Sequence, residues 1–79
     1  MIDYLDELEV PRKFVSSTNI KSVGYHQPTE ALVVEFIKGN IYLYTSVPED
    51  IYRNLMNAIS IGQYFNIMIK NKFDTTKLR

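Results

Sequence analysis

The sequence contains no cysteine, one histidine and no apolar run near the roughly 18 residues that span a bilayer. Without cysteine there can be no disulfide framework, thiolate metal site or cysteine nucleophile, and a reducing cytoplasm is the expected compartment. The first residues are acidic where a signal peptide needs a basic start, so we expect neither secretion nor membrane insertion. His26 has no second ligand nearby in the sequence, so we expect a loop residue, no metal and no cofactor.

Glycine and proline are also scarce, with three of each, whereas hydrophobic residues make up 46% of the chain and ten residues are tyrosine or phenylalanine. This composition is typical of a packed globule and excludes the polar, highly charged class of disordered chains. A chain of 79 residues fits one domain, because so short a chain cannot support two hydrophobic cores. We therefore expect one folded domain with a small margin of stability.

The residue patterns that carry catalysis are missing as well. No serine stands in a glycine-flanked elbow, no carboxylate pair is distinctive, and neither Gly39 nor Gly62 belongs to a phosphate-binding loop of recognised spacing. The sequence therefore predicts a binding module and not an enzyme.

The formal net charge is zero, but the charges are unevenly distributed along the chain. Residues 1–50 have eight acids and four bases, whereas residues 51–79 have one acid and five bases. Two interpretations remain open: the two parts neutralise each other in the folded domain, or the C-terminal bases form an edge that faces a polyanion. Those five bases are Arg53, Lys70, Lys72, Lys77 and Arg79.

Hydrophobic alternation predicts an α+β fold with a three-stranded antiparallel sheet. β-Branched residues favour a strand over 17–25, and two further strands over 31–37 and 41–45 flank a turn around Gly39. The sheet is expected to pack with one face against a C-terminal helical hairpin.

Two helices are predicted from capping signals and helical spacing, over about 47–59 and 61–72. Each begins with a serine followed three residues later by an acid or amide, at Ser46 and at Ser60. A short helix is also expected within residues 1–15, where Ile2, Leu5 and Leu8 recur at a spacing of three. The predicted organisation is an extension over 1–15, a domain over 16–73 and a frayed tail over 74–79.

The turn around Gly39 decides which way two tyrosines point. A two-residue turn pairs Phe36 with Leu43 and turns Tyr42 and Tyr44 away from the helices; local turn preference favours this register. A three-residue loop places the tyrosines beside Phe36 and Val34 and turns them toward the helices. Both registers remain open at the level of sequence.

Several of these residues occur in a pattern that resembles the KTSC family, a short domain at the C-terminus of some lysyl-tRNA synthetases that also occurs as stand-alone bacterial proteins. The similarity runs from about Ser17 to Phe73. It rests on Leu32, Val34, Phe36 and Gly39, on Tyr42-Leu43-Tyr44, on Val47-Pro48 with Tyr52, and on Ala58-Ile59-Ser60-Ile61-Gly62-Gln63-Tyr64-Phe65-Asn66 with Ile69-Lys70. The resemblance implies no catalytic residues, and its synthetase context suggests RNA binding.

Each candidate binding residue has both a functional and a structural interpretation. Tyr42 and Tyr44 can stack bases or simply pack the sheet. Ser60 and Gly62 can open an anion site at a helix N-terminus, or cap that helix and make room for its neighbour. Asn66 and Lys70 lie four residues apart on one helical face and can contact RNA or form a solvated surface. Arg53 and Lys72 complete the candidate set as phosphate contacts.

Three functions are compatible with these features. The first is an RNA-binding module in which the tyrosines stack bases and the basic residues meet phosphates. The second is a protein-interaction or inhibitor module that acts as a homo-oligomer, suggested by net neutrality and the apolar N-terminal extension. The third is a binder of a small phosphorylated ligand at the Ser60–Gly62 corner.

Overall fold

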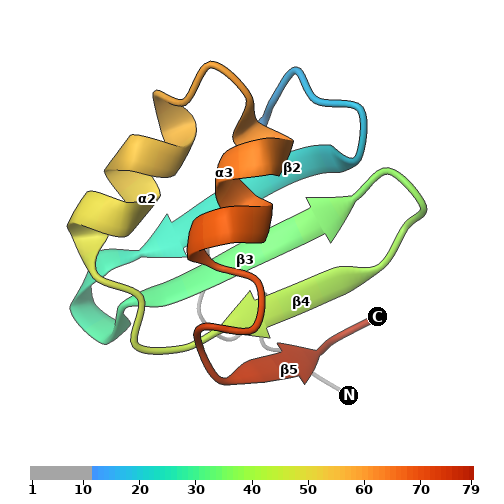
Figure 1. Ribbon diagram of the computed structural model, residues 1–79. Coiled ribbons are helices and arrows are strands. Elements are labelled where there is room, and N and C mark those ends of the chain that lie inside the picture. Colours follow the sequence, from blue (N-terminus) through green and yellow to red (C-terminus); the bar gives the residue numbers. More distant parts are fainter. Residues whose placement is uncertain (1–11) are drawn as a thin grey trace.

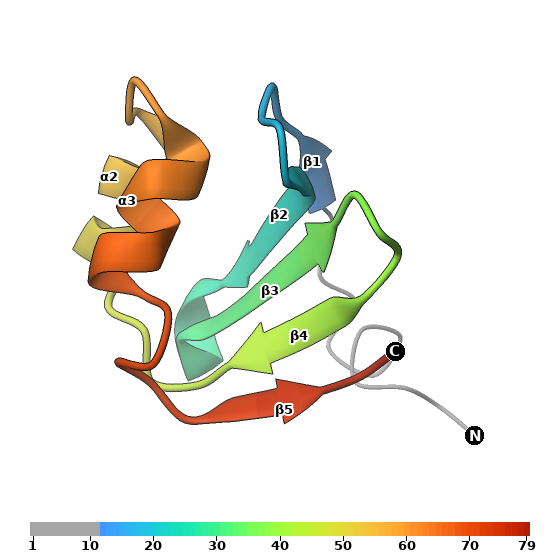
Figure 2. The ribbon, with the colours of Figure 1, turned by 45° about the vertical axis from the view of Figure 1, so that its right-hand side comes forward.

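A five-stranded antiparallel sheet with two helices on one of its faces makes up residues 12–79, the part that this computed structural model describes (Figures 1 and 2). The strands are β1 (Arg12–Phe14), β2 (Ile20–His26), β3 (Ala31–Phe36), β4 (Ile41–Tyr44) and β5 (Thr75–Lys77). Their order in the sheet follows their order in the chain. The helices α2 (Glu49–Met56) and α3 (Ile61–Met68) lie between β4 and β5, and a 3-10 turn, η1 (Gln27–Thr29), joins β2 to β3.

The prediction of an α+β fold is confirmed, but the prediction of three strands is too low. β5 occupies the segment expected to be a frayed tail, because the amide of Leu78 donates to the carbonyl of Ile41 (2.8 Å) and the amide of Thr45 donates to the carbonyl of Asp74 (3.0 Å). β1 pairs with β2 within the predicted extension. The predicted N-terminal helix falls mainly on residues 1–11, which lie outside the described residues, and Arg12–Phe14 form a strand.

Both helices are shorter than predicted. At α3 the expected cap is present, since the hydroxyl of Ser60 accepts a hydrogen bond from the amide of Gln63 (3.3 Å). The expected cap at Ser46 is wrong: Ser46 has a left-handed φ of 60°, and α2 begins only after Pro48. A second left-handed residue, Asn71 (φ 63°), follows α3 and keeps the helix from reaching residue 72.

The β3–β4 hairpin differs from the register that local turn preference favours. Val34 lies opposite Tyr42 and Val33 opposite Leu43, whereas the two-residue turn pairs Phe36 with Leu43. The loop has three residues, 37–39: the amide of Phe36 donates to the carbonyl of Asn40, and the amide of Gly39 donates to the carbonyl of Phe36, both at 2.8 Å. Gly39 has a φ of 105°, which glycine adopts without strain.

This register turns both tyrosines toward the helices, as the alternative loop predicts, although their partners are Val34 and Leu32. Ile41 and Leu43, which the two-residue turn would place under the helices, lie on the opposite face with Ala31 and Val33. A shift in pairing by an odd number of residues exchanges the two faces of a strand. The wrong turn therefore predicted the wrong face for every side chain of β4.

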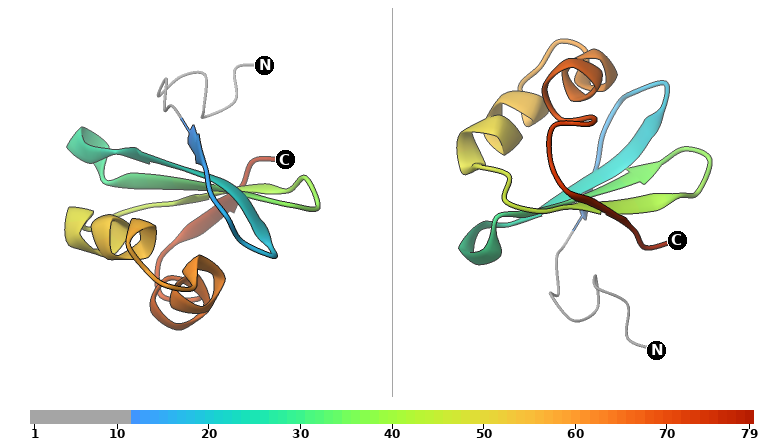
Figure 3. Two further views of the ribbon diagram at one scale, coloured as in Figure 1. Left: turned by 90° about the horizontal axis from the view of Figure 1, so that it is seen from above. Right: turned by 60° about the horizontal axis from the view of Figure 1, so that its bottom comes forward.

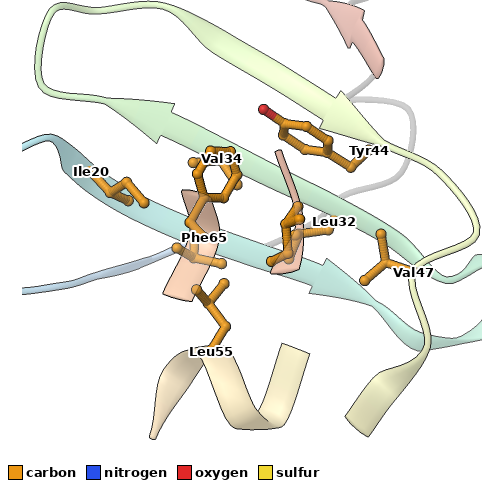
Figure 4. Close-up of a cluster of buried hydrophobic side chains, with 9 residues drawn as sticks. Ile20, Leu32, Val34, Tyr44, Val47, Leu55 and Phe65 are labelled. Carbon is orange, nitrogen blue, oxygen red and sulfur yellow. The ribbon is translucent and has the colours of Figure 1, made fainter. Parts of the chain in front are cut away.

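The main hydrophobic core lies between the sheet and the helices (Figures 3 and 4). Its members are 5% exposed or less, namely Ile20, Val23, Leu32, Val34, Tyr44, Val47, Leu55, Phe65 and Ile69. Each fully buried aliphatic side chain contributes about 1.5 to 3 kcal/mol. On the opposite face a second cluster has Leu78 packed against it. Within residues 12–79, no helix has the length and hydrophobicity required to cross a membrane.

Candidate functional site

Three adjoining hollows form a groove between α3, the loop 15–19 and the β3–β4 hairpin, and Asn19 lines all three of them. The corner hollow lies between residues 16–19 and the start of α3, with a volume of about 720 Å³. The aromatic hollow lies between α3 and β4, with a volume of about 350 Å³. The hairpin hollow lies beside the β3–β4 loop, with a volume of about 420 Å³. The hollows are neighbours, because Asn66 lines the first two and Tyr42 the last two.

Four aromatic rings from two strands and one helix line the aromatic hollow: Phe36, Tyr42, Tyr44 and Phe65. Successive ring centroids are separated by 5.8 Å for Phe36–Tyr42, 6.5 Å for Tyr42–Tyr44, 5.4 Å for Tyr44–Phe65 and 5.5 Å for Phe65–Phe36. The rings therefore form a closed cluster, and three of its four contacts are edge-to-face. Packing of this kind fixes the shape of the hollow.

The two tyrosines of this cluster differ in accessibility. Tyr44 is 5% exposed and packs edge-to-face against Phe65 of α3, whereas Tyr42 is half-buried. Burial, and to a smaller extent Tyr42, raises the pKa of Tyr44 to about 12, so its hydroxyl stays protonated at neutral pH. A ligand in the groove would meet the ring of Tyr42 first.

Polar side chains surround these rings. Asn19, Asn66, Lys70, Asn71 and Thr75 line the same hollow and are exposed. Asn66 lies in the last turn of α3, whereas Lys70 follows the helix, which ends at Met68; both line the hollow, although the helix that was predicted to carry both does not reach Lys70. Asn71 joins them because its left-handed backbone reverses the chain after the helix. The hollow thus combines an aromatic floor with three carboxamides and one ammonium group.

The corner hollow contains Ser60 and Gly62 but has little room for an anion over the glycine. A Cβ at Gly62 would lie 2.5 Å from Oδ1 of Asn19, so this oxygen already occupies the space next to the helix start. Ser17 holds Asn19 there, because its hydroxyl donates to that oxygen (2.9 Å). Gly62 therefore makes room for a side chain from the loop, and not for the neighbouring helix as the sequence suggested.

The remaining predicted residues lie apart from the groove. Arg53 projects from α2 and forms an exposed ion pair with Glu49 (3.7 Å), a contact that contributes little to stability. Lys72 follows α3 but lines none of the three hollows. Nδ1 of His26 lies 2.7 Å from the hydroxyl of Thr29. Among residues 12–79, no group of acidic or histidine side chains is arranged to hold a metal ion.

A second aromatic pair lies outside the groove and has a structural role. The rings of Tyr25 and Tyr52 stack at 4.7 Å, and the hydroxyl of Tyr25 donates to the carbonyl of Val47 (2.5 Å). Burial and then the nearby carboxylates of Glu30, Glu49 and Asp50 raise the pKa of Tyr25. This acidic end of the molecule is unsuited to a polyanion.

Sequence reasoning thus identified four residues that the structure brings together, Tyr42, Tyr44, Asn66 and Lys70. It missed Asn19 and Asn71 as site residues, and it placed Phe36 and Phe65 only in the core. The one available signal for Asn19 was the polar run Ser16-Ser17-Thr18-Asn19 before a hydrophobic strand. No local signal indicates that this run lies next to α3, which begins 42 residues after Asn19.

A model of the KTSC domain matches residues 16–73, and this chain belongs to that family. The crystal structure of KTSC domain protein YPO2434 from Yersinia pestis has the same fold, with a TM-score of 0.84 and 38% sequence identity. The similarity covers 89% of this chain and 99% of that one. The resemblance recognised in the sequence is therefore confirmed.

Relatives of two kinds share this domain. The lysine–tRNA ligase of Nostoc punctiforme is 44% identical over 59 residues, which are 75% of this chain and 10% of the ligase. An uncharacterized protein from Stutzerimonas stutzeri is 36% identical over 59 residues, which are 75% of this chain and 83% of that protein. This chain thus spans about a tenth of the ligases that it matches, where it corresponds to their C-terminal part.

Proposed function

We propose that this chain is a non-catalytic module that binds single-stranded RNA in the groove between α3 and the β3–β4 hairpin. The observation that carries the proposal is the aromatic hollow, where Tyr42 and three further rings lie beside the ammonium group of Lys70. Bases stack on aromatic rings with about 1 to 3 kcal/mol each, and lysine attracts the phosphates that link them.

The relatives supply independent support. Some of them are lysine–tRNA ligases that carry this domain as a C-terminal part, so in those proteins the domain belongs to an enzyme named for tRNA. We propose RNA as the partner of this chain because it matches that part of the ligases. The affinity for RNA should be modest and salt-dependent, since few basic side chains line the groove.

The test is fluorescence anisotropy with a labelled single-stranded RNA of eight mixed nucleotides, at about 50 and 150 mM salt. Tyr42→Ala should weaken binding about fivefold or more, because one stacking contact is lost. Lys70→Ala should weaken binding and reduce its salt dependence. Lys72→Ala is the matched control: this lysine is close in sequence but lines none of the hollows, so its loss should have a smaller effect.

A second candidate is a protein-binding module, favoured by exposed apolar side chains outside the core. Phe14 on β1 is 78% exposed, and Ile59 and Ile67 are also exposed. The same samples discriminate between the two. Absence of saturable RNA binding, together with a solution mass above the 9.2 kDa of one copy, would reject the RNA proposal in favour of self-association.

A further inference from the structure

We infer that the aromatic hollow selects an unpaired purine by donating hydrogen bonds to its N7 atom. The inference rests on the proposed RNA-binding function and specifies which base the groove takes. It follows from the donors that surround the four rings, from the size of the hollow and from the absence of partners for those donors among residues 12–79.

The amide and ammonium donors at this hollow have no partner within the described structure, whereas the hydroxyl of Thr75 donates to the carbonyl of Phe73 (3.0 Å). No hydrogen bond or ion pair within residues 12–79 involves the side chains of Asn66, Lys70 or Asn71. Asn19 has its oxygen engaged by Ser17, so its Nδ2 group is the donor that remains available. Three carboxamides and one ammonium group therefore line one hollow, and no contact within residues 12–79 engages their N–H groups.

Such a donor set can bind the N7 edge of a purine. Adenine and guanine both present N7 as an acceptor, and asparagine and lysine both donate to it, asparagine with adenine and lysine with guanine. Uracil and cytosine have no acceptor at that position.

The size of the hollow also suits a purine. Its volume of about 350 Å³ lies at the lower end of small-molecule sites, large enough for the two fused rings of a purine. The larger ring system also covers more of the aromatic floor around Tyr42. A base inside a duplex could not reach this floor, whereas an unstacked base presents both its face and its N7 edge.

The experiment compares labelled uridine hexamers with hexamers in which one central uridine is replaced by adenosine, guanosine or 7-deazaadenosine. The full chain should bind the adenosine and guanosine oligomers about tenfold more tightly than hexauridine. The 7-deaza oligomer keeps the stacking surface and replaces N7 by a C–H group, so its affinity should fall back toward that of hexauridine.

Variants locate the preference in the hollow. Asn66→Ala should reduce the purine-to-uridine ratio about threefold or more with little change for hexauridine, since a stacking contact survives and a donor is lost. Asn54→Ala on α2 is the matched control, an exposed asparagine on the other helix that lines none of the three hollows.

The outcomes separate this inference from the proposal beneath it. Equal affinity for all four oligomers, or an undiminished preference for 7-deazaadenosine, would overturn N7 recognition and leave RNA binding intact. Absence of binding to every oligomer would reject RNA binding itself. A purine preference that Asn66→Ala does not alter would place recognition outside the aromatic hollow and would also overturn the inference.

Discussion

At the scale of single residues, Gly62 controls the approach of the loop 15–19 to α3. Its φ is not in the left-handed region, so glycine is needed for space and not for backbone conformation. The atom that a Cβ would meet is the terminal oxygen of Asn19, the end of a flexible side chain that can rotate away. Since Asn19 lines all three hollows, a methyl group at residue 62 would reshape the groove and leave the core unchanged.

Gly62→Ala should therefore separate stability from binding. Alanine is favoured over glycine in a helix by up to about 1 kcal/mol, which offsets the displaced contact between Asn19 and Ser17. We expect the free energy of unfolding in urea to change by less than about 1 kcal/mol. RNA affinity in the anisotropy assay should fall about threefold or more, as for loss of one base contact. Destabilisation by several kcal/mol, or unchanged affinity, would contradict this account.

Single residues also show what local sequence can and cannot predict. Ser60 and Ser46 have the same capping pattern, yet only Ser60 caps a helix. Ser46 fails because the chain leaving β4 is fixed by a bond from the amide of Val47 to the carbonyl of Glu30 (2.9 Å), a contact between distant segments. The capping pattern makes a helix start at the serine favourable, and tertiary contacts determine whether the helix begins there.

At the scale of elements, the central strands and both helices were predictable because their apolar residues recur with a clear period. The edge strands β1 and β5 have three residues each and no such pattern, and β5 is exposed throughout. They exist because a neighbouring strand offers free backbone groups, which no window of sequence reveals. The candidate site was predicted in part for the same reason: α3 carries Asn66 and β4 carries the tyrosines, whereas Lys70 follows α3 and Asn19 comes from an irregular loop.

The docking of β5 gives a prediction at this scale. Leu78 follows the strand and packs against the second cluster of Ala31, Val33, Ile41 and Leu43. Leu78→Ala should lower the free energy of unfolding by about 1 to 2 kcal/mol, less than for a fully buried leucine because Leu78 is half-buried. Chemical denaturation measures the change, with Lys77→Ala as an exposed control. Equal stability of both variants would mean that the segment after β5 does not pack.

At the scale of the whole molecule, the charges divide more sharply at residue 11 than at residue 50, where the sequence analysis divided them. Residues 1–11 contain four acids and no base, whereas residues 12–79 contain nine bases and five acids. Among the described acids, Glu30, Glu49 and Asp50 lie near Tyr25, and Glu35 is paired with Arg12 (3.2 Å). A tethered group of four negative charges should oppose the approach of a polyanion to the positive remainder.

Neutralising the four N-terminal acids in the full chain should therefore raise RNA affinity. The variant carries Asp3→Asn, Asp6→Asn, Glu7→Gln and Glu9→Gln, and we expect about fivefold tighter binding at 50 mM salt. The gain should shrink as salt rises toward about 300 mM, because exposed charges are then screened. Unchanged or weaker binding at low salt would show that these acids do not influence the groove.

The agreement between strand order and chain order has a consequence for how the molecule is assembled. The hairpins β2–β3 and β3–β4 close short loops, whereas 30 residues separate β4 from β5, and closing a longer loop costs more entropy. The last strand should therefore dock late in folding. Asn71 lines the aromatic hollow from the chain between α3 and β5, and Thr75 lines it from the start of β5, so the hollow becomes complete only when that final pairing closes.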